Sequence, residues 1–345
     1  MAAETLSGLC GSPSVREAEG SAVSRLDDGQ DNSTLSSSPH PFLLSPISQG
    51  IALVKAKAPT LLPLLFRKLA DESAEVSGAV GVTLVNLSSD PVMLESLLAA
   101  NVCDRLMEHI RSISCPHHDY LTMILANVTT TEDGVRKLVQ HEDERLWGFN
   151  LAVLLKLFVD SVDRTPDLYE HVAHVLCNVT SVATARRLVL EKGRGLLDAL
   201  RPQLTARSTV RRRGAAGTFK NCCMGAVADK TLGNLVENES LLRSFLLPIG
   251  GGTDRDSDDV VRETLIEALH ALAVTPEGRN ALVRQKAQDI MREGYADEEN
   301  HQVNRVMEAI MDELLKHPDV AKQIAANVEN NMVSYEEEAD GYGVD

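Results

Sequence analysis

The sequence predicts an all-α fold in which helices stack as a solenoid. A short motif, Leu-x-Asn followed by an apolar residue and Ser or Thr, places asparagines at positions 86, 127 and 178, with a weaker copy at Asn221. The four asparagines stand 41, 51 and 43 residues apart, and a period of roughly 40–47 residues is typical of armadillo and HEAT repeats. Aromatic residues make up only 3% of the chain, so Leu, Ala and Val must fill the core, which disfavours a β-sandwich. We therefore expect an armadillo/HEAT-like right-handed superhelical solenoid.

Each motif is followed by a segment that predicts the start of another helix. Thr131-Glu-Asp-Gly134 follows Asn127, and a fifth, degenerate unit has Thr275-Pro-Glu-Gly278, with Ala271 in the asparagine position. One helix is thus expected to end near each motif, and the next helix to begin after a short turn.

Three residue pairs predict where such helices begin. Asp90-Pro91, Thr165-Pro166 and Thr275-Pro276 each join a capping residue to a proline. A side-chain oxygen at the N-cap accepts a backbone N–H of the first turn, and proline is tolerated at the first helical position.

Composition divides the chain into three parts. Residues 1–45 are rich in Ser, Gly and Asp and predict a disordered tail, residues 46–330 the solenoid, and residues 331–345 a disordered acidic tail. Pro59 and Pro63 predict an irregular first helix. The glycines and acidic residues at 248–258 predict a loop that separates the last repeats from the others.

Charge and cysteine usage limit the possible functions. The net charge of −16 argues against binding nucleic acid over a wide face, and six Phe, five Tyr and one Trp are too few for base stacking in every repeat.

Six scattered cysteines without CxxC indicate a reducing compartment. We find neither a secretory signal nor an apolar stretch long enough to span a membrane, so we expect a cytoplasmic protein. The Asn-x-Ser/Thr matches are then interpreted as helix motifs and not as glycosylation sites.

The asparagine row is the first candidate site. Equivalent positions of successive repeats align along one face, so Asn86, Asn127, Asn178 and Asn221 should form a row. Facing a groove, each amide could bond the backbone of a bound peptide. Buried, each could instead bond the adjacent turn and fix the bend between helices. The sequence leaves both interpretations open.

A basic cluster is the second candidate site. Five cations fall within 14 residues of an otherwise acidic chain: Arg207, Arg211, Arg212, Arg213 and Lys220. Such a cluster suits the carboxylates of a partner protein, and the alternative is a solvated charged face.

Signals for metal binding and catalysis are weak. His171, His174 and Cys177 share a helical face, and Cys115 precedes two histidines, but neither group has a second half at zinc spacing. Gly250–Thr253 is not followed by Lys-Ser/Thr, and neither Gly-x-Ser-x-Gly nor His-Glu-x-x-His occurs. We expect no metal, no cofactor and no enzymatic activity.

Several segments together resemble one family. They are Leu84–Ser88, Leu125–Thr129, Arg212–Cys223, Leu246–Pro248, Val261–Ala268 and Thr275–Arg279. Over roughly residues 50–316 the chain resembles the eukaryotic HGH-one homologue family. The resemblance implies an armadillo-like co-chaperone that binds newly made translation elongation factor two and helps to hand it to the cytosolic chaperonin.

The resulting hypothesis is a client-binding groove. We expect the asparagine row to line it, with Arg211, Arg212 and Arg213 at its edge, and the client to supply an acidic or extended segment. The alternative is a generic armadillo adaptor in nuclear transport or the ubiquitin pathway. Trp147 is followed by Asn150, three and not four positions on, which disfavours the Trp-x-x-x-Asn array of import adaptors. The sequence leaves the oligomeric state open.

Overall fold

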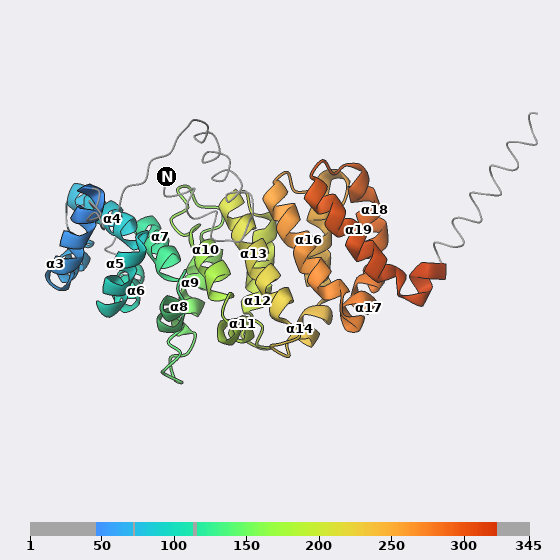
Figure 1. Cartoon of the computed structure of the whole chain (residues 1–345), viewed down its shortest axis with the longest axis horizontal. Coiled ribbons are helices and arrows are strands. Elements are labelled where there is room, and N and C mark those ends of the chain that lie inside the picture. Colours follow the sequence, from blue (N-terminus) through green and yellow to red (C-terminus); the bar gives the residue numbers. More distant parts are fainter. Residues whose placement is uncertain (1–45, 72, 113–115, 323–345) are drawn as a thin grey trace, which may run out of the picture. The chain divides into compact units, whose positions relative to one another are not determined.

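The computed structural model describes residues 46–71, 73–112 and 116–322 of the 345-residue chain (Figure 1). Within these residues the regular structure is helical and no strand occurs, which confirms the all-α prediction. The chain divides into two compact units, unit 1 (Met1–Val182) and unit 2 (Ala183–Asp345). The predicted tails, 1–45 and 331–345, lie outside the described residues, as do the last eight residues of the predicted solenoid.

Unit 1 repeats a three-helix pattern in which every third helix carries the asparagine motif. The motif helices are α4 (Ala74–Ser88), α7 (His118–Val128) and α10 (Val172–Val179). The helices before and between them are α3 (Pro46–Lys68), α5 (Pro91–Ala99), α6 (Val102–Arg111), α8 (Glu132–Leu138) and α9 (Phe149–Asp160). Helix α7 packs beside both α4 and α10 (Figure 1).

Unit 2 continues the pattern. Its motif-type helices are α13 (Thr209–Gly225), α16 (Asp259–Ala273) and α19 (His301–Leu315), with α16 packed between the other two (Figure 1). The intervening helices are α11 (Ala183–Val189), α12 (Leu196–Leu200), α14 (Leu232–Val236), α15 (Glu239–Leu246), α17 (Pro276–Arg284) and α18 (Ala287–Ala296). Short 3₁₀ helices cover Arg201–Thr205 (η2), Leu247–Ile249 (η3) and Gly252–Asp254 (η4). The predicted loop at 248–258 therefore holds two helical turns.

Two of the three predicted helix starts are confirmed. Asp90 accepts the N–H groups of Val92 and Met93 at 2.8 and 3.2 Å, and Thr275 accepts that of Gly278 at 3.0 Å. The prediction at Thr165-Pro166 is wrong, because α10 begins only at Val172. Between them the Asp167 carboxylate accepts the N–H of Tyr169 at 3.1 Å, which stabilises a turn in place of a helix.

Gly134 and Gly278 occupy equivalent positions where only glycine fits. Each lies three residues after a capping threonine, at the start of the helix that follows a motif helix. A Cβ on either glycine would lie 2.0 Å from a carbonyl oxygen of the preceding helix. The Thr-x-x-Gly signature thus records both the cap and the close approach of two backbones.

Helix α3 differs from its prediction. It runs without a break through Pro59 and Pro63, where the sequence predicted an irregular start. Both prolines are exposed. Proline has no N–H, so the carbonyls of Lys55 and Pro59, four residues earlier, lose their usual intrahelical donors.

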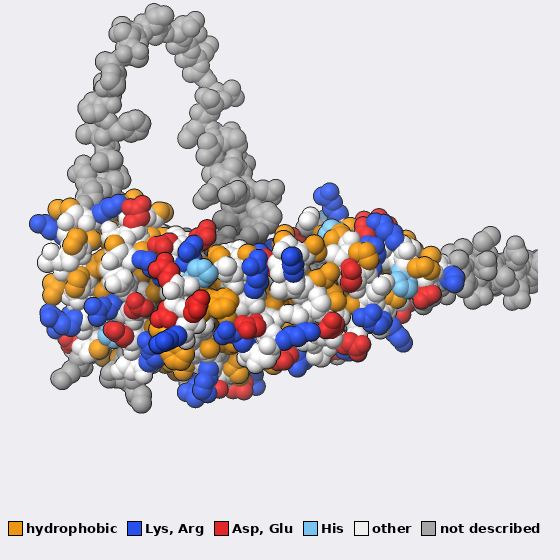
Figure 2. All heavy atoms as spheres, turned by 90° about the horizontal axis from the view of Figure 1, so that it is seen from below, with side chains coloured by type: hydrophobic (Ala, Val, Ile, Leu, Met, Phe, Trp, Pro, Cys, Tyr) orange, Lys and Arg blue, Asp and Glu red, His pale blue; other side chains and the backbone are white. Residues whose placement is uncertain are grey.

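The core of each unit is built from aliphatic side chains of the three-helix repeats. Leu84, Leu125, Leu176, Phe219 and Leu269 occupy equivalent positions of successive motif helices, and each is at most 2% exposed. On the face shown in Figure 2, acidic and basic side chains are interspersed with apolar ones. The chain's net charge of −16 is therefore not expressed as one uniformly acidic surface on that face.

Candidate partner-binding surface

Two of the row asparagines join successive repeats in unit 1. Asn127 donates its amide to Ser88 Oγ at 2.9 Å and to the Val85 carbonyl at 3.4 Å. Asn178, one repeat later in α10, makes a similar contact and donates to the Ala126 carbonyl at 2.8 Å. Both side chains are buried, so each amide stabilises the contact with the previous motif helix and not only the adjacent turn.

The other two asparagines lie differently. Asn86, in the first motif helix, is exposed, and Asn221 is half-buried in α13. The row is therefore not uniform: two of its members are used inside the protein, while Asn86 offers its amide to solvent.

The residue three positions after each motif asparagine, or after Ala271 in the fifth repeat, differs in type between the two units. In unit 1 this position holds Ser89, Thr130 and Ser181, each exposed, whose hydroxyls donate to the carbonyl of the asparagine three residues earlier at 2.7–2.8 Å. In unit 2 the same position holds Met224 and Val274, whose exposed fractions are 65% and 49%. The sequence pattern of the motif alone did not reveal this change from hydroxyl to apolar side chains.

Two more apolar side chains are exposed at the same ends of the unit 2 helices. Val227 follows α13 and is 63% exposed, and Leu315 ends α19 and is 40% exposed. Because α13, α16 and α19 lie side by side (Figure 1), equivalent ends of these repeats share one side of the unit. We name the set Met224, Val227, Val274 and Leu315 the apolar edge. Exposed apolar groups gathered on one side commonly mark contact surfaces.

The basic cluster is not the free surface patch that the sequence predicted. Arg211 is fully buried and donates from Nη1 to Gln203 Oε1 at 2.8 Å. Arg212 makes a two-pronged pair with Asp256, with an Nε–Oδ2 distance of 2.7 Å. A buried guanidinium needs such partners, because an unpaired charge in the interior is costly.

Of the three remaining predicted cations, Arg207 is exposed and the other two are paired. Arg213 contacts Asp258 at 2.8 Å, and Lys220 contacts Glu267 at 2.8 Å. The Arg213 side chain keeps 38% of its surface exposed and Lys220 only 15%. The hydrogen bond that Arg213 donates to the Asp258 carboxylate raises the pKa of Arg213. Acidic residues of the same chain thus neutralise most of the cluster.

The loop at 248–258 supplies Asp256 and Asp258 and closes a second, buried cluster. The Glu298 side chain has no exposed surface and accepts hydrogen bonds from Arg255 at 2.7 Å and from Arg262 at 2.8 and 2.9 Å. Burial opposes its ionisation, but the hydrogen bonds and charges of Arg262, the Asn300 N–H and Arg255 outweigh it and lower the pKa of Glu298 to about 2. The loop therefore connects α13 to the turn between α18 and α19.

Comparisons with known proteins agree with the repeat architecture. A family model described as a domain of unknown function (DUF383) matches residues 109–280. A protein named Protein HGH1 homolog from Xenopus laevis is 28% identical over 281 residues, covering 74% of this chain and 77% of the relative. The proteins of that name from Rattus norvegicus and Homo sapiens are also 28% identical, covering 82% and 80% of this chain and 78% and 76% of their own.

The chain belongs to the HGH1 homolog family. The matched span of the family model includes Asn127, Asn178, Asn221 and the basic cluster.

Solved structures support the fold. A designed armadillo repeat protein aligns with a TM-score of 0.58 at 16% identity, covering 73% of this chain and 99% of that protein. An engineered protein aligns with a TM-score of 0.59, also at 16% identity, over 73% of this chain and 95% of its own. At this identity the likeness establishes the armadillo-type fold and nothing about ligands.

Within the described residues of this HGH1 family member, the side chains do not form an evident chemical centre. No group of three His, Cys, Asp or Glu residues in that part of the chain could hold a metal ion. His171 and His174 stack on each other with ring centroids 5.9 Å apart, and Cys177 is buried. Burial raises the pKa of the Cys222 thiol to about 12 and that of Cys223 well above its usual value, so neither is a reactive thiolate. No helix among these residues is both long and apolar enough to cross a membrane.

Proposed function

We propose that this chain is a non-enzymatic, cytoplasmic co-chaperone that binds newly made translation elongation factor two and links it to the cytosolic chaperonin. Membership of the HGH1 family and the armadillo-type repeats support a role in protein interaction. The apolar edge of unit 2 is the observation that carries the client-binding part of the proposal. A partly folded client exposes apolar side chains, which an apolar surface binds without consuming energy.

The client contact is proposed to combine this edge with polar groups beside it. Asn221 lies three residues before Met224, and Arg213, whose side chain is 38% exposed, lies on the same helix. We also assign Asn86 a contact with a partner, since its amide is exposed. By contrast, the largely buried polar groups of five residues are bonded within the protein and act through the stability of the repeats: Asn127, Asn178, Arg211, Arg212 and Lys220.

The test uses the tagged full chain and a charge introduced at the apolar edge. Wild type, captured from a lysate of its source at low salt, should retain elongation factor two together with chaperonin subunits. The variant Met224→Glu/Val274→Glu should retain about tenfold less elongation factor two, equivalent to about 1.4 kcal/mol. The matched control is Thr130→Glu/Ser181→Glu, which places two charges at the equivalent exposed positions in unit 1 and should bind normally.

Two results would refute the proposal. If wild type retained import receptors or ubiquitin ligases without elongation factor two, the chain would be a generic adaptor. If the double variant retained as much elongation factor two as wild type, the apolar edge would not be the client contact. Circular dichroism of each variant confirms that helical content is unchanged.

A further inference from the structure

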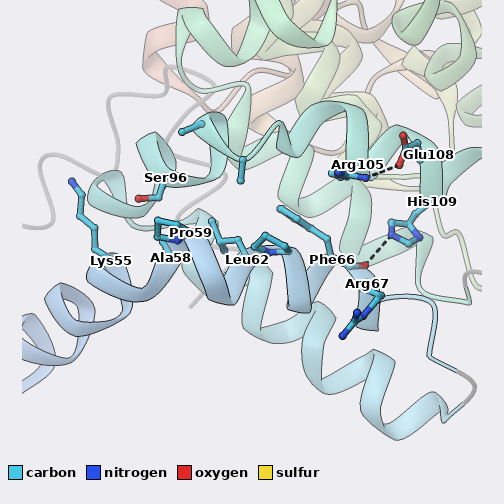
Figure 3. A pocket seen from close by; sticks show the side chains of 13 residues that line it. Lys55, Ala58, Pro59, Leu62, Phe66, Arg67, Ser96, Arg105, Glu108 and His109 are labelled. Atoms are coloured by element: carbon cyan, nitrogen blue, oxygen red, sulfur yellow. Dashed lines mark hydrogen bonds and ion pairs between the residues drawn. The ribbon is translucent and has the colours of Figure 1, made fainter.

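A groove in unit 1, between α3 and the pair α5 and α6, has a volume of about 810 Å³ (Figure 3). One face of α3 forms its floor and one wall. Ala58, Leu62 and Phe66 lie under this floor and are each at most 3% exposed. Its accessible apolar surface comes from Pro59 and Pro63, which are exposed. Ala99 of α5 contributes to the opposite wall and is exposed. A groove with an apolar floor and open walls suits an extended segment better than a globular surface.

The rim of this groove is cationic in a chain that is otherwise acidic. Lys55, Arg67 and Arg105 line it, with one lining carboxylate, Glu108. Lys55 also pairs with the exposed Glu95 beside the groove at 3.2 Å. The Arg105 side chain is 57% exposed and stands 3.6 Å from Glu108, and Arg67 is exposed. An exposed pair of this kind is worth little, so Arg105 can exchange Glu108 for a partner's carboxylate at small cost. Because like charges repel, the rim selects against a basic segment.

The prolines of α3 belong to the same wall. Lys55, Pro59, Pro63 and Arg67 are spaced four residues apart, and all four line the groove. The two exposed proline rings therefore place apolar surface between two cations.

We propose that this groove binds an extended acidic segment of a partner protein, with apolar side chains between its carboxylates. Lys55 and Arg67 are 12 residues apart on one helix, which corresponds to about 18 Å at 1.5 Å per residue. An extended peptide covers this distance in five or six residues at about 3.3 Å each. The preferred segment therefore has acidic residues five or six positions apart, with leucine or phenylalanine between them over Pro59 and Pro63.

This site is separate from the apolar edge of unit 2, so its test does not depend on elongation factor two. The probe is a fluorescein-labelled synthetic peptide with glutamates at both ends, six positions apart, and leucine and phenylalanine between them. Its binding to the purified full chain is measured by fluorescence anisotropy. We expect saturable binding that weakens as salt is raised, since the contacts are exposed charges. A peptide with lysines in place of the glutamates should bind at least tenfold more weakly.

Two variants test the two halves of the argument. Arg67→Glu/Arg105→Glu reverses the rim charge and should weaken the probe at least tenfold. Ala99→Phe fills the groove without changing charge and should weaken it similarly. Arg243→Glu, at an exposed arginine of α15 in unit 2, is the matched control and should bind as wild type does. Thermal unfolding of each variant confirms that it is folded.

Three outcomes would overturn the proposal. They are absence of saturable binding by wild type, equal binding by the lysine peptide, and unchanged binding by both groove variants. Displacement of the probe by a short single-stranded RNA at the same salt would assign the groove to a phosphate polymer, and would also overturn it.

Discussion

The substitution Glu298→Gln tests the buried ion cluster that closes unit 2. The Glu298 carboxylate has no exposed surface and receives three guanidinium hydrogen bonds, from Arg255 and Arg262. It also accepts the N–H of Asn300 at 2.9 Å. Glutamine keeps the size of the side chain but removes its charge, and its NH₂ group would face donors. Arg255 would then remain near the interior without a counter-charge, and Arg262 would keep only Asp259, at 2.6 Å.

The magnitude follows from the loss of one partner from a buried pair, which costs about 3–5 kcal/mol. We expect the free energy of unfolding of unit 2 to fall by about 3 kcal/mol, the lower end, because water reaches Arg255 and Arg262 at the rim (15% and 7% exposed). The assay is urea unfolding of the full chain followed by far-ultraviolet circular dichroism. Trp147 is the chain's one tryptophan and lies in unit 1, so its fluorescence reports separately on that unit.

The control is Glu237→Gln, which breaks the exposed pair between Lys192 and Glu237 in the same unit and should cost less than about 1 kcal/mol. A change below about 0.5 kcal/mol for Glu298→Gln would refute the reasoning.

The pH dependence of the free energy of unfolding gives a second check. Because the pKa of Glu298 is lowered from 4.5 to about 2, its contribution is complete above pH 4.5 and is lost as pH falls toward 2. In the Gln variant this part of the acid sensitivity should be absent.

Two further predictions concern the repeats. Asn127→Ala should lower the free energy of unfolding by about 1–3 kcal/mol, because it removes a buried amide and leaves the buried Ser88 hydroxyl oxygen without its donor. The exposed Asn86→Ala should change it by less than about 0.5 kcal/mol. Equal effects in urea unfolding would contradict the inter-repeat role of Asn127. Gly278→Ala should cost about 1–3 kcal/mol, because its Cβ would lie 2.0 Å from the Leu272 oxygen. Gly233→Ala, whose nearest neighbour is a side-chain end at 3.5 Å, should instead gain about 0.5–1 kcal/mol, and thermal unfolding distinguishes the two.

The periodic part of the structure could be predicted from the sequence because it depends on local signals. The asparagine motif located the motif helices of four repeats, and Asp90 and Thr275 marked helix starts. Thr165 failed as a marker because the neighbouring Asp167 offered its carboxylate to a turn. Local capping chemistry predicts a helix only where no competing side chain captures the same backbone.

Whether the cations of the basic cluster are paired within the chain could not be predicted from the local sequence, because their partners lie one repeat away. Arg212 pairs with Asp256 and Arg213 with Asp258, 44 and 45 residues on. Arg255 pairs with Glu298 at a similar separation of 43 residues. Opposite charges spaced at the repeat period were therefore the signal for pairing, and a search at that spacing would have identified the 248–258 loop as their source.

The asparagine bonds between repeats also have a direction. Asn127 donates to the helix that ends at Ser88, and Asn178 donates to α7, the motif helix before its own. In unit 2, Asn234 likewise donates backward, to the Leu190 carbonyl at 2.8 Å. A chain that leaves the ribosome N-terminus first exposes each of these acceptors before the donor has been synthesised. Every newly emerged repeat can therefore dock on a template that is already folded, so the protein is suited to vectorial assembly during translation.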